Sequence, residues 1–275
     1  AMGYGALGGD TLGDRAVAIG RGALENQNFT TSTDNYNVAV GWAAGNDITT
    51  GLNNVLIGGE AGDALTDADF NVALGTYALS GDTKGSQSVA IGHAALFNQN
   101  FTTATTSFNV AVGSQAGNDI TTGTNNTFVG GLAGDALTDA DFNVGMGKNA
   151  LGSDTLGSKG TAIGTFALET QNFTTATDSL NVAVGYFAGL SVTTGVQNTL
   201  IGAQVGDALT DADFNTAMGY LALSTDTLGS KSTALGYAAL KDQNFTTATD
   251  SYNVAVGHLT GENVTTGQYN TLIGG

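Results

Sequence analysis

The sequence contains neither cysteine nor proline. Without cysteine, the fold has no disulfide bonds and no thiolate metal sites. Glycine is abundant instead, with 42 of the 275 residues, which is about twice the usual share. Abundant glycine without proline excludes collagen and proline-rich linkers, and it favours a chain with many tight turns.

Basic residues are also scarce. Seven Lys and Arg stand against 24 Asp and Glu, which gives a net charge of −17. Binding to a nucleic-acid backbone or to an anionic membrane surface requires clustered Lys and Arg, so we expect no nucleic-acid partner. No apolar run approaches the ~18 residues of a membrane helix, so we expect no membrane insertion. Hydrophobic residues nevertheless make up 41% of the chain, enough to build a core.

One five-residue phrase, Asn-Val-Ala-Val-Gly, recurs through the chain. It stands at residues 37–41, 109–113, 181–185 and 253–257, at an offset of 72 residues each time. Looser copies divide each 72-residue unit into three coils of 17 residues and one of 21. A fixed period of this kind indicates a repeat protein, and we interpret residues 1–275 as a single repetitive segment of about sixteen coils. Both ends fall in mid-repeat, so we expect a fragment of a longer fibre.

Each coil carries one strand signal. The phrase Val38-Ala39-Val40 is short, largely β-branched and bounded by Asn37 and Gly41, which is typical of a strand. The frequent glycines leave little room for a helix. One strand in every repeat of fewer than about 20 residues favours an all-β fold, a parallel β-solenoid (β-roll) whose coils stack about 4.8 Å apart.

Alternation along the strand predicts which residues share a face. We assign Val38 and Val40 to the solenoid interior and Ala39 to the opposite, outward face. The row of Ala39 is apolar throughout, and the second coil of each unit places a larger residue in it: Leu56, Phe128, Leu200 and Leu272. Outward rows in water are normally polar, so we expect this row to be buried against another chain. The alternative is a lone solenoid with exposed alanines, which are common on surfaces.

Three further columns have simple interpretations. The Asn that opens each phrase, as in Asn37 and Asn54, is predicted to form a hydrogen-bonded ladder between coils. The Ala three residues after the phrase glycine, as in Ala44, suits a tight interior corner. The residue directly after that glycine varies freely between copies, as in Trp42 and His93, which predicts solvent exposure. Exposed aromatic residues there are candidates for contact with a cell-surface glycan or a protein receptor.

The phrase Asn-Val-Ala-Val-Gly, once per coil, resembles the repeat of trimeric autotransporter adhesin heads, which are left-handed parallel β-rolls. The longer texts at residues 181–189 and 193–202 are similar to repeat arrays of bacteriophage tail fibres. This resemblance implies a trimeric attachment fibre on a cell surface or virion. Adhesin heads mostly have shorter repeats than the 17- and 21-residue coils found here, which leaves the cross-section and the handedness of the solenoid open.

An acidic loop in the second coil of each unit is a candidate calcium site. It places three carboxylates within seven residues, in three copies: Asp63, Asp67 and Asp69; Asp135, Asp139 and Asp141; Asp207, Asp211 and Asp213. Calcium prefers several hard oxygen ligands, and we expect no other cofactor. The spacing matches neither an EF-hand nor the nonapeptide of calcium-binding β-rolls. The alternative is that these residues only form turns.

The sequence offers no candidate catalytic site. Enzymes concentrate their chemistry at one non-repeating place, whereas this text is spread evenly and its two histidines, His93 and His258, lie at the variable position. We therefore expect no enzymatic activity. Ice binding would use a flat threonine array, but the pairs Thr49-Thr50 and Thr102-Thr103 stand at different distances from the phrase glycine.

Together these features predict an acidic, extracellular, homotrimeric fibre segment that attaches to a host or surface, as an adhesin or a tail fibre does. The first alternative is a self-assembling structural filament, whose partner is the same chain. An ice-binding solenoid is the second alternative.

Overall fold

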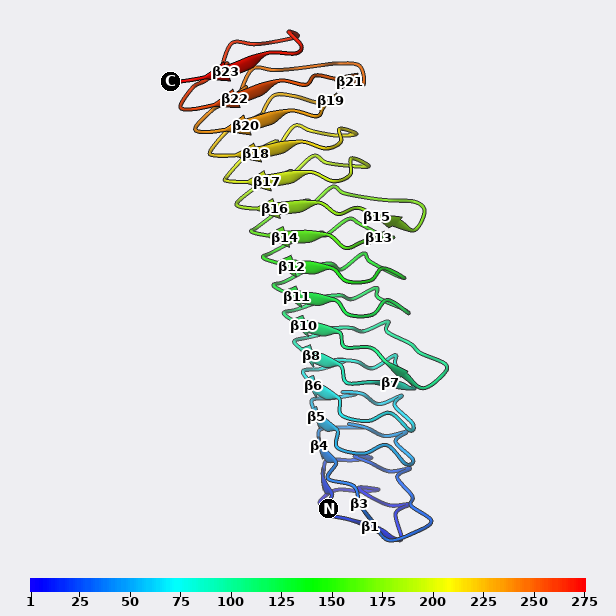
Figure 1. The fold of residues 1–275 in the computed structure, drawn as a ribbon. Coiled ribbons are helices and arrows are strands. Elements are labelled where there is room, and N and C mark those ends of the chain that lie inside the picture. The colour runs from blue at the N-terminus through cyan, green and yellow to red at the C-terminus, as the bar shows by residue number, and fades with distance from the viewer. The chain divides into compact units, whose positions relative to one another are not determined.

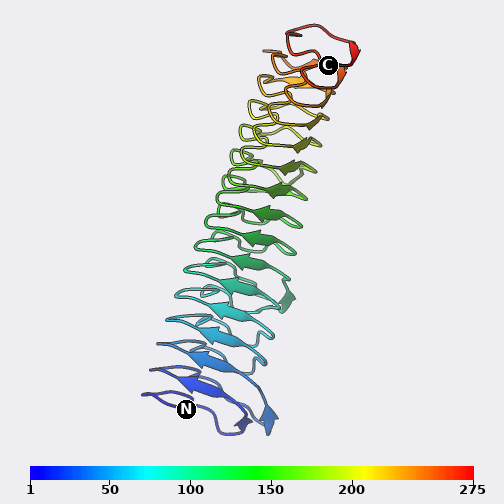
Figure 2. The ribbon, with the colours of Figure 1, turned by 90° about the vertical axis from the view of Figure 1, so that its left-hand side faces the viewer.

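The computed structural model describes all of residues 1–275, and it contains strands and turns but no helix. Contacts within the chain divide it into two compact units, Ala1–Ala140 and Asp141–Gly275. Each unit is a parallel β-solenoid, as the sequence predicts, with one three-residue strand per turn (Figures 1 and 2). The chain therefore forms no helix of the length and apolarity that crossing a bilayer requires.

The main strands stack one per coil within each unit. Those of the first unit are β2 (Val17–Ile19), β4 (Val38–Val40), β5 (Val55–Ile57), β6 (Val72–Leu74), β8 (Val89–Ile91), β10 (Val110–Val112) and β11 (Thr127–Val129). Those of the second are β12 (Val144–Met146), β14 (Thr161–Ile163), β16 (Val182–Val184), β17 (Thr199–Ile201), β18 (Thr216–Met218), β20 (Thr233–Leu235), β22 (Val254–Val256) and β23 (Thr271–Ile273). Equivalent residues of neighbouring strands lie directly opposite each other, as Ala39 does to Leu56.

The 21-residue coils keep this register. Across one of them, Ala90 on β8 still pairs with Ala111 on β10, so the additional residues must leave the stack elsewhere. They do so in wider loops, each marked by a pair of two-residue strands (Figure 1). These pairs are β1 (Gly13–Asp14) with β3 (Thr33–Asp34), β7 (Gly85–Ser86) with β9 (Thr105–Thr106), β13 (Gly157–Ser158) with β15 (Thr177–Asp178), and β19 (Gly229–Ser230) with β21 (Thr249–Asp250).

The structure reverses the predicted orientation of the strands. Ala39 and Leu56, at the strand centres, are fully buried inside the solenoid, whereas Ile57 is 37% exposed on the outside. The assignment of the valine face to the interior was therefore wrong. The larger residues of the alanine row do not contact a partner chain either, because Leu56, Phe128 and Leu200 are fully buried within their own chain.

The reason for this orientation is a match between large and small residues across a narrow interior. Leu56 lies over Gly45 and Gly62, where an added Cβ would stand 2.7 Å from Leu56 Cδ1 and 2.8 Å from Leu56 Cδ2, respectively. In other coils the position of these glycines holds a buried leucine, such as Leu79 or Leu151, and the strand centre is then an alanine or, at Gly145, a glycine. Close packing leaves space for one large side chain from either wall, but not from both.

The predicted asparagine ladder is confirmed. Asn37 is fully buried, and its Oδ1 accepts a hydrogen bond from the backbone N of Asn54 at 2.9 Å. Its Nδ2 donates to the carbonyl oxygen of Gly51, in the same coil, at 2.7 Å. Each asparagine thus closes its own coil and bonds to the next. Ala44 is also fully buried, as its place at an interior corner predicts.

The phrase glycines are required by their backbone conformation and by close stacking. Gly41 has a φ of +148°, and a Cβ on it would lie 2.2 Å from the carbonyl oxygen of Gly58 in the next coil. No other residue fits such a position. These glycines therefore fix the turn that follows every strand.

Candidate functional site

The outer face of the strand ladder consists of two columns that contain no charged residue. The column before the buried centre reads Val17, Val38, Val55, Val72, Val89, Val110 and Thr127 in the first unit, and Val144, Thr161, Val182, Thr199, Thr216, Thr233, Val254 and Thr271 in the second. The column after it reads Ile19, Val40, Ile57, Leu74, Ile91, Val112 and Val129, then Met146, Ile163, Val184, Ile201, Met218, Leu235, Val256 and Ile273. We call these two columns the outer strand face.

The outer strand face is accessible to solvent in the single chain. Leu74 is 43% exposed and Met218 is 46% exposed. Single exposed hydrophobic residues are ordinary, but a contiguous apolar patch is typical of an interaction surface. When one face of a sheet packs on the core and the other meets water, the second face is normally polar. Here the face that meets water is mostly apolar and carries no charge. The outer strand face is therefore the strongest candidate for a contact surface.

A second conspicuous feature is a buried aspartate, Asp82, Asp154 or Asp226, that anchors three of the four 21-residue coils. Asp82 is fully buried, and its Oδ1 accepts hydrogen bonds from the backbone N of Gly85 at 3.0 Å and of Phe101 at 3.1 Å. Its Oδ2 accepts a bond from Gln99 Nε2 at 2.6 Å. Because Phe101 and Gln99 belong to the longer coil, the carboxyl group holds that coil against the preceding one.

The same glutamine connects the longer coil to the asparagine ladder. Gln99 Nε2 also donates to Ser88 Oγ at 2.9 Å, and Gln99 Oε1 accepts from Asn109 Nδ2 at 2.8 Å. Equivalent bonds join Gln171 to Asp154 and Gln243 to Asp226. The sequence analysis missed this anchor. The pattern that could have predicted it is an Asp followed by Gly three residues later and by Gln 17 residues later, which occurs in every 72-residue repeat.

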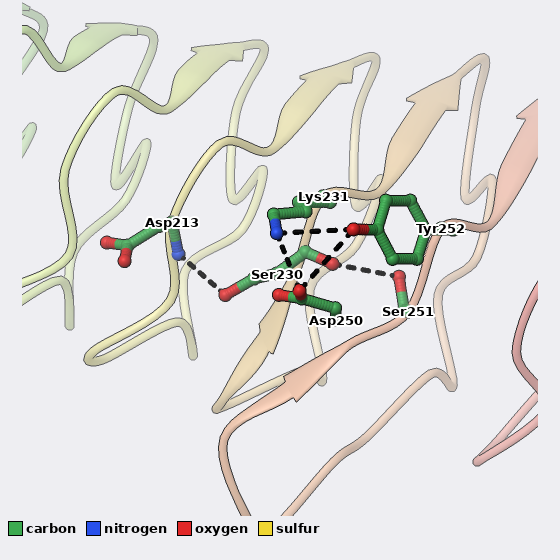
Figure 3. A network of polar contacts seen from close by, with 6 residues as sticks. All are labelled: Asp213, Ser230, Lys231, Asp250, Ser251 and Tyr252. Carbon is green, nitrogen blue, oxygen red and sulfur yellow. Dashed lines mark hydrogen bonds and ion pairs between the residues drawn. The ribbon is translucent and has the colours of Figure 1, made fainter.

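The outer corner of the 21-residue coil carries an exposed polar network in the second unit (Figure 3). Lys231 Nζ contacts Asp250 Oδ2 at 2.5 Å and Tyr252 Oη at 3.3 Å. The hydrogen bond to Asp250, followed by that to Tyr252, raises the pKa of Lys231. Ser251 Oγ donates to the carbonyl oxygen of Ser230 at 3.1 Å. This network orders the projecting loop at its surface, where solvent screening keeps such contacts weak.

The acidic loops, predicted as calcium sites, give their carboxylates separate roles. Asp69 Oδ1 accepts a bond from the backbone N of Leu52 at 2.7 Å, and Asp67 Oδ1 accepts one from Thr66 Oγ1 at 3.2 Å. In the other copies, Asp139 and Asp211 each accept a bond from a threonine one coil earlier, and Asp213 accepts one from the backbone N of Val196. No group of three or more His, Cys, Asp or Glu side chains is placed to hold one metal ion. Calcium binding stays a prediction that this geometry does not favour.

The first aspartate of each loop lies deeper than the other two. Burial, the largest cause, together with the nearby Glu60 and Asp47 raises the pKa of Asp63 to about 6. Burial also raises the pKa of Asp135 to about 6 and the pKa of Asp207 above its ordinary value. The Oδ1 atoms of Asp63, Asp135 and Asp207 have no hydrogen-bond partner. Partial removal of water thus shifts the proton equilibrium of these groups toward the protonated form, and backbone hydrogen bonds offset only part of that shift.

The variable column behaves as the sequence predicts. Trp42 and Tyr186 are more than half exposed, and His93 is exposed as well. In the second unit, Tyr237 stacks on His258, with ring centroids 4.9 Å apart.

Comparisons with protein-family models, curated proteins and solved structures find no match to this chain. The case for a function therefore depends on the surfaces of the molecule itself.

Proposed function

We propose that this chain is a segment of an extracellular attachment fibre in which copies of the chain, three in number, pack through their outer strand faces. One observation carries the proposal: two adjacent columns of apolar and threonine side chains cover the outer face in both units without a single charge. In a chain with a net charge of −17, such a face is unusual. Burying it between chains removes apolar area from water, which stabilises association.

A second copy fits this face better than an unrelated partner does. The outer strand face repeats at every coil, and it passes through the 21-residue coils without a shift in register. Only a partner with the same coil spacing can match it continuously, and another copy of the chain has that spacing. Sheets that pack face to face interdigitate their side chains in this way. The trimeric state itself comes from the resemblance to adhesin heads.

The other surfaces of the solenoid suit attachment. The loops of the 21-residue coils project from the stack (Figure 1), and Trp42, His93 and Tyr186 of the variable column are exposed. The residue of the variable column differs between copies while the coil beneath it is constant, and the loops keep the text Gln-Asn-Phe-Thr-Thr in all four copies. Mobile or variable loops on a rigid scaffold are a common arrangement for binding. The adhesive role, the host or surface target and the extracellular location all belong to this proposal.

Sedimentation equilibrium of the purified chain tests the assembly. We expect the mass of three chains over the concentration range of the experiment. A monomer at all concentrations would refute packing through the outer strand face. A mass that grows without limit, with long filaments in electron micrographs, would favour the alternative of a self-assembling structural filament.

A further inference from the structure

One groove interrupts the repetition of the first unit. It has a volume of about 560 Å³ and is lined by Tyr77, His93, Ala94, Phe97, Asn98, Gln115 and Asn118. The first four belong to two adjacent coils, and Gln115 and Asn118 belong to the next. This volume lies within the range of ordinary ligand sites.

The groove exists because a small residue stands between two large ones in one column. Tyr77, Ala94 and Gln115 occupy the same position of three successive coils, two residues after the phrase glycine. Ala94 forms the buried floor, and Tyr77 and Gln115 are exposed on either side of it. Since stacked coils are about 4.8 Å apart and the walls are two coils apart, their backbones stand about 9.6 Å apart, which leaves space between the side chains for about one sugar ring.

The aromatic side of the groove is ordered by contacts between its rings. The ring of Tyr77 meets that of His93 edge-to-face at a centroid distance of 6.2 Å, and that of Phe97 at 6.1 Å. Edge-to-face contacts at these distances are favourable. They hold three aromatic groups in place around one groove, so these side chains lose little conformational entropy when a ligand binds.

The opposite rim supplies amide groups. Asn98 Nδ2 donates to Asp119 Oδ1 at 3.0 Å, and Asn118 Nδ2 donates to the carbonyl oxygen of Ala94 at 3.1 Å. These bonds fix both side chains in place. An amide has two donor hydrogens and an acceptor oxygen, so each retains hydrogen-bonding capacity for a ligand, as does the exposed Gln115.

The same place in the other 72-residue units lacks this chemistry. The position of Phe97 is charged in the three other copies, which have Glu25, Glu169 and Lys241. In the last copy, Lys241 Nζ pairs with Glu262 Oε1 at 3.4 Å, and the column beside it reads Leu221, Ala238 and Leu259. The repeated scaffold therefore does not require the aromatic and amide set, which the other three copies of the 72-residue repeat lack.

We propose that this groove binds a neutral oligosaccharide of pyranose sugars, a ligand class that deepens the adhesive role proposed above and rests on it. A pyranose ring has an apolar C–H face, which packs on the electron-rich face of an aromatic ring. Its hydroxyl groups bond well to amide donors and acceptors. The net charge of −17 disfavours anionic sugars through long-range repulsion. Tyr77, His93 and Phe97 would form the stacking side, and Asn98, Gln115 and Asn118 the polar rim.

Saturation-transfer NMR and calorimetry on the whole chain test the proposal, with maltohexaose, cellohexaose and N-acetylated chitohexaose as neutral probes and hexagalacturonate as the anionic one. We expect at least one neutral probe to bind and hexagalacturonate not to bind. The variants Tyr77→Leu and Phe97→Lys place in the groove the residues of the last copy, which that copy accommodates. Loss of an aromatic contact should weaken binding by roughly tenfold or more. The matched control Tyr237→Leu, in the last copy, should leave binding unchanged.

Failure of all neutral probes to bind, or binding that survives both groove variants, would overturn the proposal. A change in assembly mass caused by Tyr77→Leu or Phe97→Lys would also overturn it, since the groove would then be a contact between chains. The assembly proposal is tested separately by the mass of the unmodified chain. Sugar binding by a monomeric chain would support the groove while refuting the trimer.

Discussion

On each three-residue strand the central side chain points into the solenoid, and its two neighbours point out. The buried column holds a large residue such as Leu200 where the opposite wall has glycine both in its own coil and in the preceding one, and a small residue in the other coils. The outer columns show no such matching, since Val, Ile, Leu, Met and Thr follow one another freely. The side chains of the inner face are thus matched to one another in volume, whereas the outer face maintains only an uncharged, largely β-branched surface. Such a surface is suited to a broad contact with another chain.

The largest expected effect is on the inner face. Replacing Leu200 by Ala removes a fully buried side chain opposite two glycines, so the cavity cannot be filled by a neighbour. The free energy of unfolding should fall by about 2–5 kcal/mol, measured by urea denaturation. Val182→Thr on the outer face is the matched control, because the neighbouring strands already carry Thr161 and Thr199 there. It should change the stability by no more than about 0.5 kcal/mol, and equal losses would refute the distinction between the faces.

The match between large and small residues is tested at Gly206, which has a φ of +52° and where a Cβ would lie 2.9 Å from Leu200 Cδ2. Gly206→Ala should destabilise the fold by about 1–3 kcal/mol, through overpacking and the left-handed backbone. In the double variant with Leu200→Ala, part of this loss should disappear, because the cavity provides space for the new methyl group. Additive losses in the double-mutant cycle would show that the two residues do not share one space.

A charge on the outer strand face should separate folding from assembly. In a single chain Ile201 is partly exposed, so Ile201→Asp should destabilise folding by only about 1 kcal/mol. In the assembly, an unpaired carboxylate would be buried, which is strongly unfavourable, and the fibre should dissociate. Circular dichroism and sedimentation report the two effects. An Ile201→Asp variant that keeps its assembled mass would contradict the proposed contact surface.

The half-buried aspartates in the turns after the strands should make stability depend on pH. The folded pKa of Asp63 and Asp135, about 6, lies above the ordinary value of 3.8, so the folded state binds protons more tightly. The stabilising contribution of the protonated groups is complete below pH 3.8 and is lost as the pH rises through about 6. Because both groups are partly solvated, the contribution of each should be about 1 kcal/mol or less.

The double variant Asp63→Asn/Asp135→Asn isolates this contribution. Its urea midpoint should change less between pH 4.5 and pH 7 than that of the parent chain. The corresponding change at the exposed Asp67 of the same loop serves as the control. If the parent chain and the double variant show the same pH dependence, the buried aspartates are not its source.

Much of the fold follows from the sequence. The spacing of the phrase glycines predicts the coil lengths, the single strand signal predicts a parallel solenoid, and the buried asparagine column predicts the ladder between Asn37 and Asn54. The orientation of the strand does not follow from alternation alone. Alternation shows which residues share a face, but both faces of Val38-Ala39-Val40 are apolar, so polarity does not identify the interior.

Volume decides the orientation instead. The sequence holds the signal, because Leu56, Phe128 and Leu200 coincide with glycines where other coils have leucine. The hydrogen bonds of Asp82 were not predicted from the sequence for another reason, which is the ordinary text around it. Its text, Asp-Thr-Lys-Gly, is ordinary for a turn, and only the fold shows that Gln99 and Phe101 from the next coil bond to the same carboxyl group. Contacts between residues from different coils cannot be found by examining one coil.

Accessibility of a single cysteine in the assembled protein tests the outer strand face most directly. The chain has no cysteine of its own, and Met218 and Tyr220 are equally exposed in the single chain, at 46% each. Met218 lies on the outer strand face, and Tyr220 lies in the variable column. We expect maleimide to modify Met218→Cys many times more slowly than Tyr220→Cys in the native protein, and at the same rate in urea. Equal rates in the native protein would show that no second chain covers the outer strand face.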